Sequence, residues 1–360
     1  MAFMAAPPSS SMLAVMAAVA PGQPLREGLD RIRQSHKGAL IAVGDDPMVL
    51  EICSGGFLLD AAFTPQRLSE LAKMDGAIIL AGDHSRIARA NVHLVPDPSV
   101  ATSETGTRHR TAERVARSLQ VPVISISESR DAVTIYLGDE QHPLLPSVVL
   151  LARANQALQT LEQYRSRLDT TSAALGVLEV EDLVTARDVA SLLQRAEMVR
   201  RIAEEIEVAI VELGTDGRLV RLQLEELVGG IHDNRLLVVR DYVSAAHDWN
   251  VESALRGLDA LATEELLDLR TVADQLRSPN GPIDLDDALQ ARGYRLLARV
   301  RGLTEAMTHQ VVSHFGNLQK ILRATPEVLA NASGLDIARA RAVKDSLARL
   351  AETSILDRYS

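Results

Sequence analysis

The sequence contains few aromatic residues and a single cysteine. Aromatics make up 3% of its 360 residues, so a hydrophobic core must be built from Leu, Val, Ile and Ala, which fits the 46% of hydrophobic residues. The one cysteine, Cys53, can form neither a disulfide nor a cysteine-based zinc site within one chain. This composition favours a cytoplasmic protein with a sizeable core, and the length predicts two or three domains.

Long apolar runs and the common nucleotide-binding motifs are also missing. The apolar run at residues 12–20 is too short to span a bilayer, and no basic residue precedes it as a secretory signal requires, since the first is Arg26. We therefore predict no membrane partner. Residues 1–24 are instead predicted to be an N-terminal extension whose helix docks on the first domain. Neither a Walker A motif nor Gly-x-Gly-x-x-Gly after a strand is present.

Acidic and basic residues are unevenly distributed along the chain. Residues 151–290 hold 14 Lys+Arg against 26 Asp+Glu, whereas residues 291–360 hold 11 against 6. An acidic middle segment repels nucleic acid, and a basic C-terminal segment attracts its phosphates. The basic segment fits a solvated helical face equally well, so charge alone leaves both interpretations open.

Residues 25–146 predict an α/β domain. Apolar residues recur there with helical spacing in some stretches and form short buried runs in others, as in a sheet covered by helices. The expected helices span residues 25–36, 64–73 and 108–119, and the expected strands span residues 38–44, 76–80, 92–95, 121–126 and 133–137.

The rest of the chain predicts two all-α domains. Residues 147–284 contain almost no proline and form long periodic stretches at 147–175 and 186–211, which favours an elongated helical spine. Turn-forming residues at 278–282 mark its end. In residues 285–360, short helices separated by glycine predict helix-hairpin-helix units, which place backbone N–H groups at a nucleic-acid phosphate.

The segment Asp75-Gly76-Ala77 lies between a predicted helix and a predicted buried strand. A carboxylate at a strand end can bind Mg²⁺ or orient a hydroxyl for attack on phosphorus. Gly76 would permit the close approach of a ligand or of backbone. Asp-Gly is also a very common turn dipeptide, so this segment by itself predicts a turn.

The segment Gly106-Thr107-Arg108-His109-Arg110-Thr111 gives a stronger signal. Thr107 can cap the helix that follows, and two arginines in a first helical turn oppose the helix dipole unless an anion binds there. The guanidinium group of arginine can donate two parallel hydrogen bonds to the oxygens of one phosphate, so we predict a polyphosphate site. The alternative is that Arg108 and Arg110 pair with Glu104 and Glu113. Ser127 and Glu128, at the end of a strand, either reach the same cleft or form a solvated turn.

Together these two segments resemble the paired signature of the diadenylate cyclase family. The resemblance implies an α/β cyclase domain with a mixed sheet flanked by helices, two ATP as substrates, Mg²⁺ or Mn²⁺ as cofactor, and cyclic di-AMP plus two pyrophosphates as products. It implies that Asp75 is the catalytic carboxylate and metal ligand, that Gly76 and Ala77 lie along the nucleotide, and that Leu94 contacts adenine. The implied phosphate cradle consists of Thr107, Arg108, His109, Arg110 and Thr111, with Ser127 and Glu128 near the triphosphate.

The long helical middle and the terminal short helices resemble, more narrowly, family members that scan DNA integrity. This resemblance implies that the chain forms a homo-octamer with facing cyclase domains. It also implies that the protein binds branched DNA or recombination intermediates and is then associated with the nucleoid. Gly334 would lie in the last hairpin, with Arg339, Arg341 and Lys344 near the DNA. The usual Gly-apolar-Gly reads Gly334-Leu335-Asp336 here, which weakens the DNA prediction, although Asp336 can cap the next helix. Two alternative functions remain. The first is a non-catalytic DNA-binding scaffold, and the second is an ATP sensor or another nucleotidyltransferase.

Overall fold

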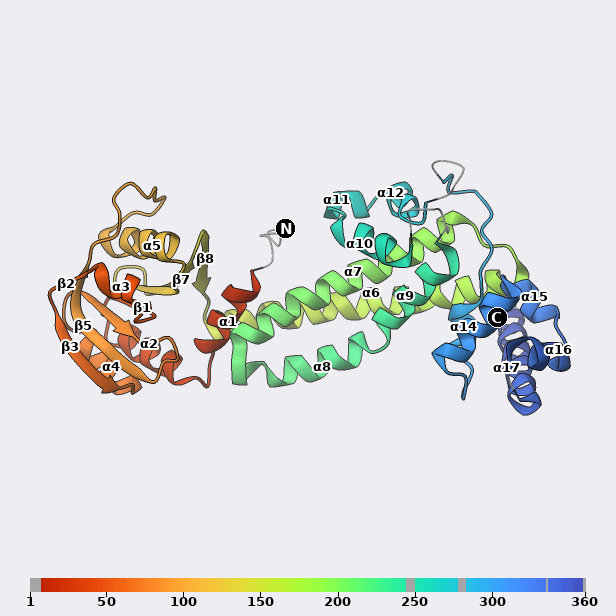
Figure 1. The fold of residues 1–360 in the computed structure, drawn as a ribbon, viewed down its shortest axis with the longest axis horizontal. Coiled ribbons are helices and arrows are strands. Elements are labelled where there is room, and N and C mark those ends of the chain that lie inside the picture. Colours follow the sequence, from red (N-terminus) through yellow and green to blue (C-terminus); the bar gives the residue numbers. More distant parts are fainter. Residues whose placement is uncertain (1–7, 244–249, 278–282, 335, 359–360) are drawn as a thin grey trace. The chain divides into compact units, whose positions relative to one another are not determined.

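The chain, seen as a computed structural model, divides into two units that are described separately (Figure 1). The structure describes residues 8–243, 250–277, 283–334 and 336–358. Unit 1 comprises Met1–Leu158 with Glu205–Gln223, and unit 2 comprises Gln159–Glu204 with Leu224–Ser360. The predicted break at residues 278–282 lies outside the described residues, and the predicted four-domain division stays a prediction.

Unit 1 contains a mixed sheet, which confirms the predicted fold class. The strands run in the order β2-β5-β4-β1-β6-β7-β8, with β3 paired to β5, and β1 and β4 are parallel while the other pairs are antiparallel. The strands are β1 Ala39–Val43, β2 Cys53–Ser54, β3 Phe57–Ala62, β4 Ala77–Leu80, β5 Arg86–Leu94, β6 Val123–Ser127, β7 Ala132–Leu137 and β8 Glu140–Leu144.

Helices cover both faces of this sheet (Figure 1). They are α1 Ser10–Ala18, α2 Pro24–Gln34, α3 Pro47–Glu51, α4 Pro65–Leu71 and α5 Thr107–Leu119. Side chains alternate along a strand, so Ile41 of β1 packs with Met12 of α1 and Leu29 of α2, whereas Ala42 packs with Val115 of α5. The helix α4 begins at Pro65, because Thr64 caps it and accepts a hydrogen bond from the Arg67 N–H.

Several strands extend beyond or lie outside the predicted ones. The strand predicted at residues 92–95 is the end of β5, which begins at Arg86. Polar residues at Arg86, Arg89 and Asn91 interrupt the apolar pattern there, and two irregularities in the pairing with β4 accommodate them. The short strands β2 and β3 are mostly exposed, so they lack the buried pattern that identified the central strands.

The remaining helices confirm the predicted all-α spine. They are α6 Ser147–Glu181, α7 Ala186–Leu213, the 3₁₀ turn η1 Gly214–Gly217, α8 Arg218–Val228, α9 Ile231–Tyr242, α10 Val251–Ala260, α11 Thr263–Leu266 and α12 Leu269–Asp274. Shorter helices follow: α13 Tyr294–Leu297, α14 Glu305–Phe315, α15 Leu318–Arg323 and α16 Pro326–Ser333, and then the longer α17 Ile337–Arg358. Among the helices of the described residues, none has both the length and the apolar character that a membrane crossing needs.

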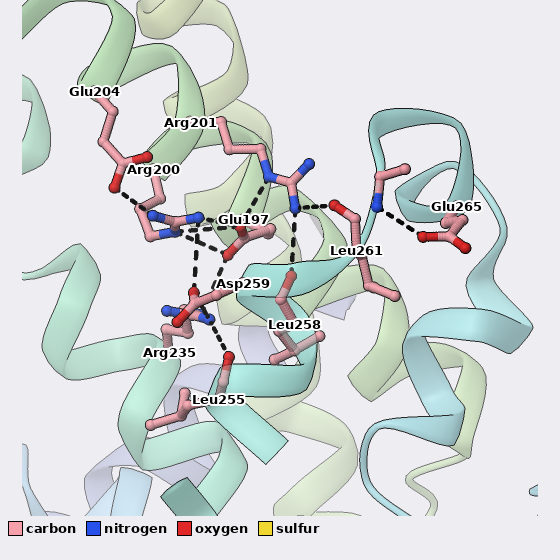
Figure 2. A network of polar contacts seen from close by, with 11 residues as sticks. Glu197, Arg200, Arg201, Glu204, Arg235, Leu255, Leu258, Asp259, Leu261 and Glu265 are labelled. Atoms are coloured by element: carbon pink, nitrogen blue, oxygen red, sulfur yellow. Dashed lines mark hydrogen bonds and ion pairs between the residues drawn. The ribbon is translucent and has the colours of Figure 1, made fainter. Parts of the chain in front are cut away.

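Buried ion pairs connect the helices of unit 2. Glu197 of α7 is fully buried and is surrounded by Arg200, Arg201 and Arg235 (Figure 2). Arg201 also donates to the Leu258 and Leu261 carbonyls, near the end of α10. A cation at a helix C-terminus satisfies carbonyls that have no partner within the helix, so this cluster fixes α10 against α7 and α9.

Candidate functional site

Gly76 is required by the sheet itself. Its φ is +97°, and a Cβ atom there would lie 2.9 Å from the Asn91 carbonyl carbon and the Val92 carbonyl oxygen of β5. A side chain would therefore collide with backbone as well as strain the φ angle. Ala77 begins β4, is 1% exposed and is paired with Val92. The Asp-Gly turn thus sets where β4 meets β5, and it leaves Asp75 just before the N-terminal end of β4.

Asp75 reaches α5 through Arg108. Its side chain is 98% exposed, and its Oδ1 accepts a hydrogen bond from the Arg108 guanidinium at 3.2 Å. The two segments that carried the sequence prediction, more than thirty residues apart, therefore meet in the folded chain. An exposed carboxylate held at one oxygen keeps its other oxygen open to a hydroxyl or a cation.

The start of α5 differs by one residue from the prediction that Thr107 caps it. The N-cap residue is Gly106, with a φ of +91° and no side-chain cap, and Thr107 is the first helical residue. A positive φ at this turn suits glycine, which moves the helix start one residue earlier. No side-chain cap occupies the first N–H groups, and these groups attract anions.

The alternative interpretation, in which these arginines pair with Glu104 and Glu113, is wrong. In the part of the chain that the structure describes, neither Arg108 nor Arg110 forms an ion pair with Glu104 or Glu113. Glu113 instead pairs with Arg117 at 3.0 Å. The arginine pattern in this helical turn therefore still calls for an anion.

A cavity of about 590 Å³ opens at the first turn of α5 and the end of β6. It brings together five predicted site residues: Thr107, Arg108, His109, Ser127 and Glu128. The other predicted residues do not line the cavity. Arg110 is exposed and Thr111 is half-buried on α5. Leu94, 4% exposed at the end of β5, belongs to the same apolar cluster as Ala77.

Sequence reasoning missed a second arginine at this cavity, Arg130. Its backbone N–H donates to the Ser127 hydroxyl at 3.3 Å, and its guanidinium donates to the Thr105 hydroxyl at 3.3 Å. The signal was present, because Arg130 follows Ser127 and Glu128 in the same turn. Its contact with Thr105 of the loop before α5 is tertiary and has no sequence signature.

His109 is held by a buried tyrosine that the sequence did not single out. Its Nδ1 lies 2.9 Å from the Tyr136 hydroxyl, and Tyr136 donates to Glu104 at 2.8 Å. Burial lowers the pKa of His109, Glu104 raises it, and Arg130 and Arg108 lower it. Burial and Glu104 raise the pKa of Tyr136. At neutral pH, His109 is therefore uncharged and Tyr136 keeps its proton.

The donor set fits a divalent cation that is shared with phosphates. Within the described ranges, no group of three or more His, Cys, Asp or Glu side chains could hold a metal by protein ligands alone. Asp75 offers one exposed carboxylate beside the cavity, which two arginines, Arg108 and Arg130, line. Mg²⁺ is commonly bound by one or two carboxylates together with substrate phosphates and water. Asp75 is thus suited to a metal that arrives with a polyphosphate.

The C-terminal residues predicted to bind DNA have mixed surroundings. Gly334 ends α16 with a φ of +66°, and Asp336 accepts a hydrogen bond from the Arg339 N–H at 2.8 Å, so Asp336 caps α17. Arg341 is exposed. The ammonium group of Lys344 instead donates a hydrogen bond to the Leu322 carbonyl, and burial lowers the pKa of Lys344. Leu335, between Gly334 and Asp336 in the sequence, lies outside the described residues.

Comparisons with known proteins match nearly the whole chain. The family model described as DisA bacterial checkpoint controller nucleotide-binding matches residues 26–141, and the one described as DisA bacterial checkpoint controller linker region matches residues 144–282. Curated relatives named DNA integrity scanning protein DisA include that of Frankia alni, 51% identical over 99% of this chain and 100% of the relative. The relative from Streptomyces avermitilis is 52% identical over 97% and 94%, and that from Kineococcus radiotolerans is 52% identical over 98% of each.

The solved structures give a weaker likeness. DacA from Staphylococcus aureus is 19% identical, with a TM-score of 0.28 over 38% of this chain and 91% of that chain. A TM-score this low supports no inference about this chain.

Proposed function

Because the chain belongs to the family of the DNA integrity scanning protein DisA and its N-terminal domain is a diadenylate cyclase domain, we propose that it condenses two ATP molecules into cyclic di-AMP and releases two pyrophosphates. The observation that carries this proposal is the contact between Asp75 and Arg108 beside the cavity at the start of α5. The contact holds a carboxylate beside a cavity lined by Arg108 and Arg130, which suits nucleotidyl transfer, because one group can accept a proton from a hydroxyl while the others offset charge on phosphate oxygens.

Each residue type has a defined task in this reaction. Arg108, Arg130 and the first N–H groups of α5 bind the triphosphate and offset the charge that develops on the leaving pyrophosphate. Asp75 accepts the proton of the ribose 3′-hydroxyl, whose oxygen forms a bond to the α-phosphorus of the other ATP while the bond to pyrophosphate breaks. A bound Mg²⁺ or Mn²⁺ would be held by Asp75 and the phosphates and would supply positive charge. Leu94, Gly76 and Ala77 are proposed to line the nucleoside, and Arg110, Thr111, Ser127 and Glu128 to complete the phosphate site.

The product requires two copies of the domain. Cyclic di-AMP joins two nucleotides symmetrically, and each cavity is proposed to bind one ATP, so two cavities must face each other with each 3′-hydroxyl in line with the opposite α-phosphorus. A two-fold contact between cyclase domains satisfies this requirement. We propose that such contacts occur within a homo-octamer, and normal turnover by a verified monomer would contradict this.

DNA binding is proposed for the C-terminal helices. The excess of basic over acidic residues in 291–360 and the glycine turn at Gly334 support helix-hairpin-helix contacts to DNA phosphates, and branched DNA is the proposed regulator of the cyclase. Asp336 places a carboxylate at the start of α17, and Lys344 is bonded within the fold, so this interaction relies on few cations. We propose that it is weak and falls steeply with salt.

Incubation of the pure protein with ATP and Mg²⁺, followed by mass identification of the product, tests the cyclase. A relict nucleotide domain on a DNA-binding scaffold would make no product, and another nucleotidyltransferase would make a different one. Asp75→Asn should abolish cyclic di-AMP while the thermal unfolding midpoint stays within about 1 °C, because Asp75 is exposed.

Asp139→Asn is a matched control for this variant. Asp139 is 91% exposed and pairs with Arg117 at 3.1 Å, so it resembles Asp75 in exposure and in having an arginine partner, but Arg117 does not line the cavity whereas Arg108 does. Asp139→Asn should keep the wild-type rate. Equal loss of product in both variants, or undiminished product in Asp75→Asn, would refute the assigned role of the carboxylate.

A further inference from the structure

The nitrogen Nε2 of His109 is buried and has no hydrogen-bond partner among the residues that the structure describes, although His109 lines the cavity. The other ring nitrogen, Nδ1, is 2.9 Å from the hydroxyl of Tyr136, and the two rings meet edge to face. A buried polar atom without a partner is rare and destabilising unless a ligand satisfies it. Nε2 is therefore a polar atom of the cavity wall that a hydrogen-bonding group of a ligand would satisfy.

The hydrogen bonds decide which nitrogen of His109 carries the proton. Tyr136 has one hydroxyl hydrogen, and it donates that hydrogen to the carboxylate of Glu104 at 2.8 Å. Its oxygen must then accept from His109, so the hydrogen of the neutral imidazole resides on Nδ1. Nε2 consequently bears a lone pair, which would repel a phosphate oxygen.

The position of Glu104 is itself fixed. The carboxylate of Glu113, 5% exposed on α5, accepts hydrogen bonds from the Thr102 hydroxyl, from the Ser103 N–H at 3.0 Å and from the Glu104 N–H at 3.3 Å. Burial raises the pKa of Glu113, but the bonds from Thr102 and Ser103 and the charge of Arg117 lower it further, so it stays ionised. The loop before α5 is thus pinned with Glu104 directed at Tyr136.

We propose that Tyr136 and Glu104 are positioning residues that let His109 take up a proton on Nε2 when a triphosphate binds. This inference rests on the proposed ATP site. The protonated imidazole donates from Nε2 to a phosphate oxygen and from Nδ1 to Tyr136, and the negative charge of Glu104, transmitted by the tyrosine hydroxyl, offsets the new positive charge. That support is needed because Arg108 and Arg130, the other charged groups facing His109, oppose its protonation.

Tyr136→Phe removes the hydroxyl and keeps the ring, which is 1% exposed in the core, and Glu104→Gln removes the charge from a side chain outside that core. Tyr294→Phe is the matched control, because the Tyr294 hydroxyl also lies 2.9 Å from a histidine Nδ1, that of His309, in unit 2. Glu104→Gln keeps the test valid if Tyr136→Phe fails to fold.

The experiment measures binding of inorganic tripolyphosphate to the full chain by calorimetry at pH 8, in buffers of different ionisation enthalpy. The number of protons taken up should be lower in Tyr136→Phe and Glu104→Gln than in the wild type and in Tyr294→Phe. The difference between variants cancels the titration of tripolyphosphate itself. The affinity for tripolyphosphate should fall roughly 10-fold in both Tyr136→Phe and Glu104→Gln, the size of a lost charge-assisted hydrogen bond. As the pH is raised, the KM for ATP of these two variants should begin to increase at a lower pH than that of the wild type.

Proton uptake and a pH profile that are unchanged in both variants would overturn the inference. A purely structural role for Tyr136 would lower the unfolding temperature without changing the proton count, and that outcome would also overturn it. Failure of the proposed function looks different, since the wild type would then make no cyclic di-AMP while the proton count on tripolyphosphate still distinguished the variants.

Discussion

Replacing Arg295 by methionine should strongly destabilise unit 2. Arg295 of α13 has a side chain that is 1% exposed, and it forms two hydrogen bonds to the fully buried carboxylate of Glu179 on α6. It also donates to the Ser172 carbonyl at 3.0 Å and hydroxyl at 3.1 Å. After the replacement, the side-chain hydrogen bond that the Glu179 carboxylate retains within the described residues comes from the Tyr242 hydroxyl, at 2.8 Å.

The expected loss follows from the burial of that carboxylate. Removing one partner of a buried ion pair leaves an uncompensated charge and typically costs 3–5 kcal/mol. For a domain of 150–250 residues, about 1 kcal/mol corresponds to 2–4 °C, so the thermal midpoint of unit 2 should fall by roughly 6–20 °C. Adding Glu179→Gln to Arg295→Met should restore much of the loss, because the charge then disappears with its partner.

Scanning calorimetry of the full chain, with hydrogen exchange of the peptides of α9 and α13, measures this effect in unit 2. Arg187→Met is the matched control. Arg187 pairs with Asp286 at 3.1 Å, but the two side chains are 53% and 81% exposed, so the loss should be 0–1 kcal/mol. A shift in Arg295→Met no larger than in Arg187→Met would refute the reasoning, as would a double variant no more stable than Arg295→Met.

Two further predictions concern the cyclase domain and the C-terminal helices. Gly76→Ala should destabilise unit 1 and abolish product, because its Cβ atom would lie 2.9 Å from the backbone of β5. Gly82→Ala is the control, since a Cβ atom there meets open space, and it should change neither stability nor product. Thermal melts by circular dichroism and product assays compare the two variants, and a Gly76→Ala enzyme with normal stability and activity would contradict the geometry. Arg341→Ala should reduce the salt dependence of DNA binding by about one phosphate contact, whereas Lys344→Ala should not, since its ammonium is bonded to the Leu322 carbonyl. Equal slopes in a fluorescence titration would contradict this.

The central strands and long helices could be predicted from local pattern. Apolar runs such as 38–44 and 121–126 have the composition of strands buried on both faces, and the structure places β1 and β6 there. The exposed strands β2 and β3 could not be predicted in this way. Their pairing with β5 depends on backbone hydrogen bonds, which leave no apolar signature in the sequence.

The candidate site was predictable in its charged residues and not in their support. The arginines of the first turn of α5 opposed the helix dipole, so the sequence itself indicated an anion. Nothing in the sequence indicated that Tyr136, 27 positions after His109, would hold its Nδ1, or that Glu104 would accept the tyrosine proton. Such contacts join a strand, a loop and a helix, and only their packing brings them together.

By itself, the sequence determined which segments are buried, which are helical and where an anion is favoured, because these follow from the spacing of apolar side chains and from charges next to each other in the chain. The tertiary structure alone decided that Asp75 meets Arg108 and that Gly76 must remain a glycine, since both depend on how closely β4 approaches β5 and α5. It also decided the protonation of His109, because burial and distant partners, rather than neighbours in sequence, set the energy of a charge.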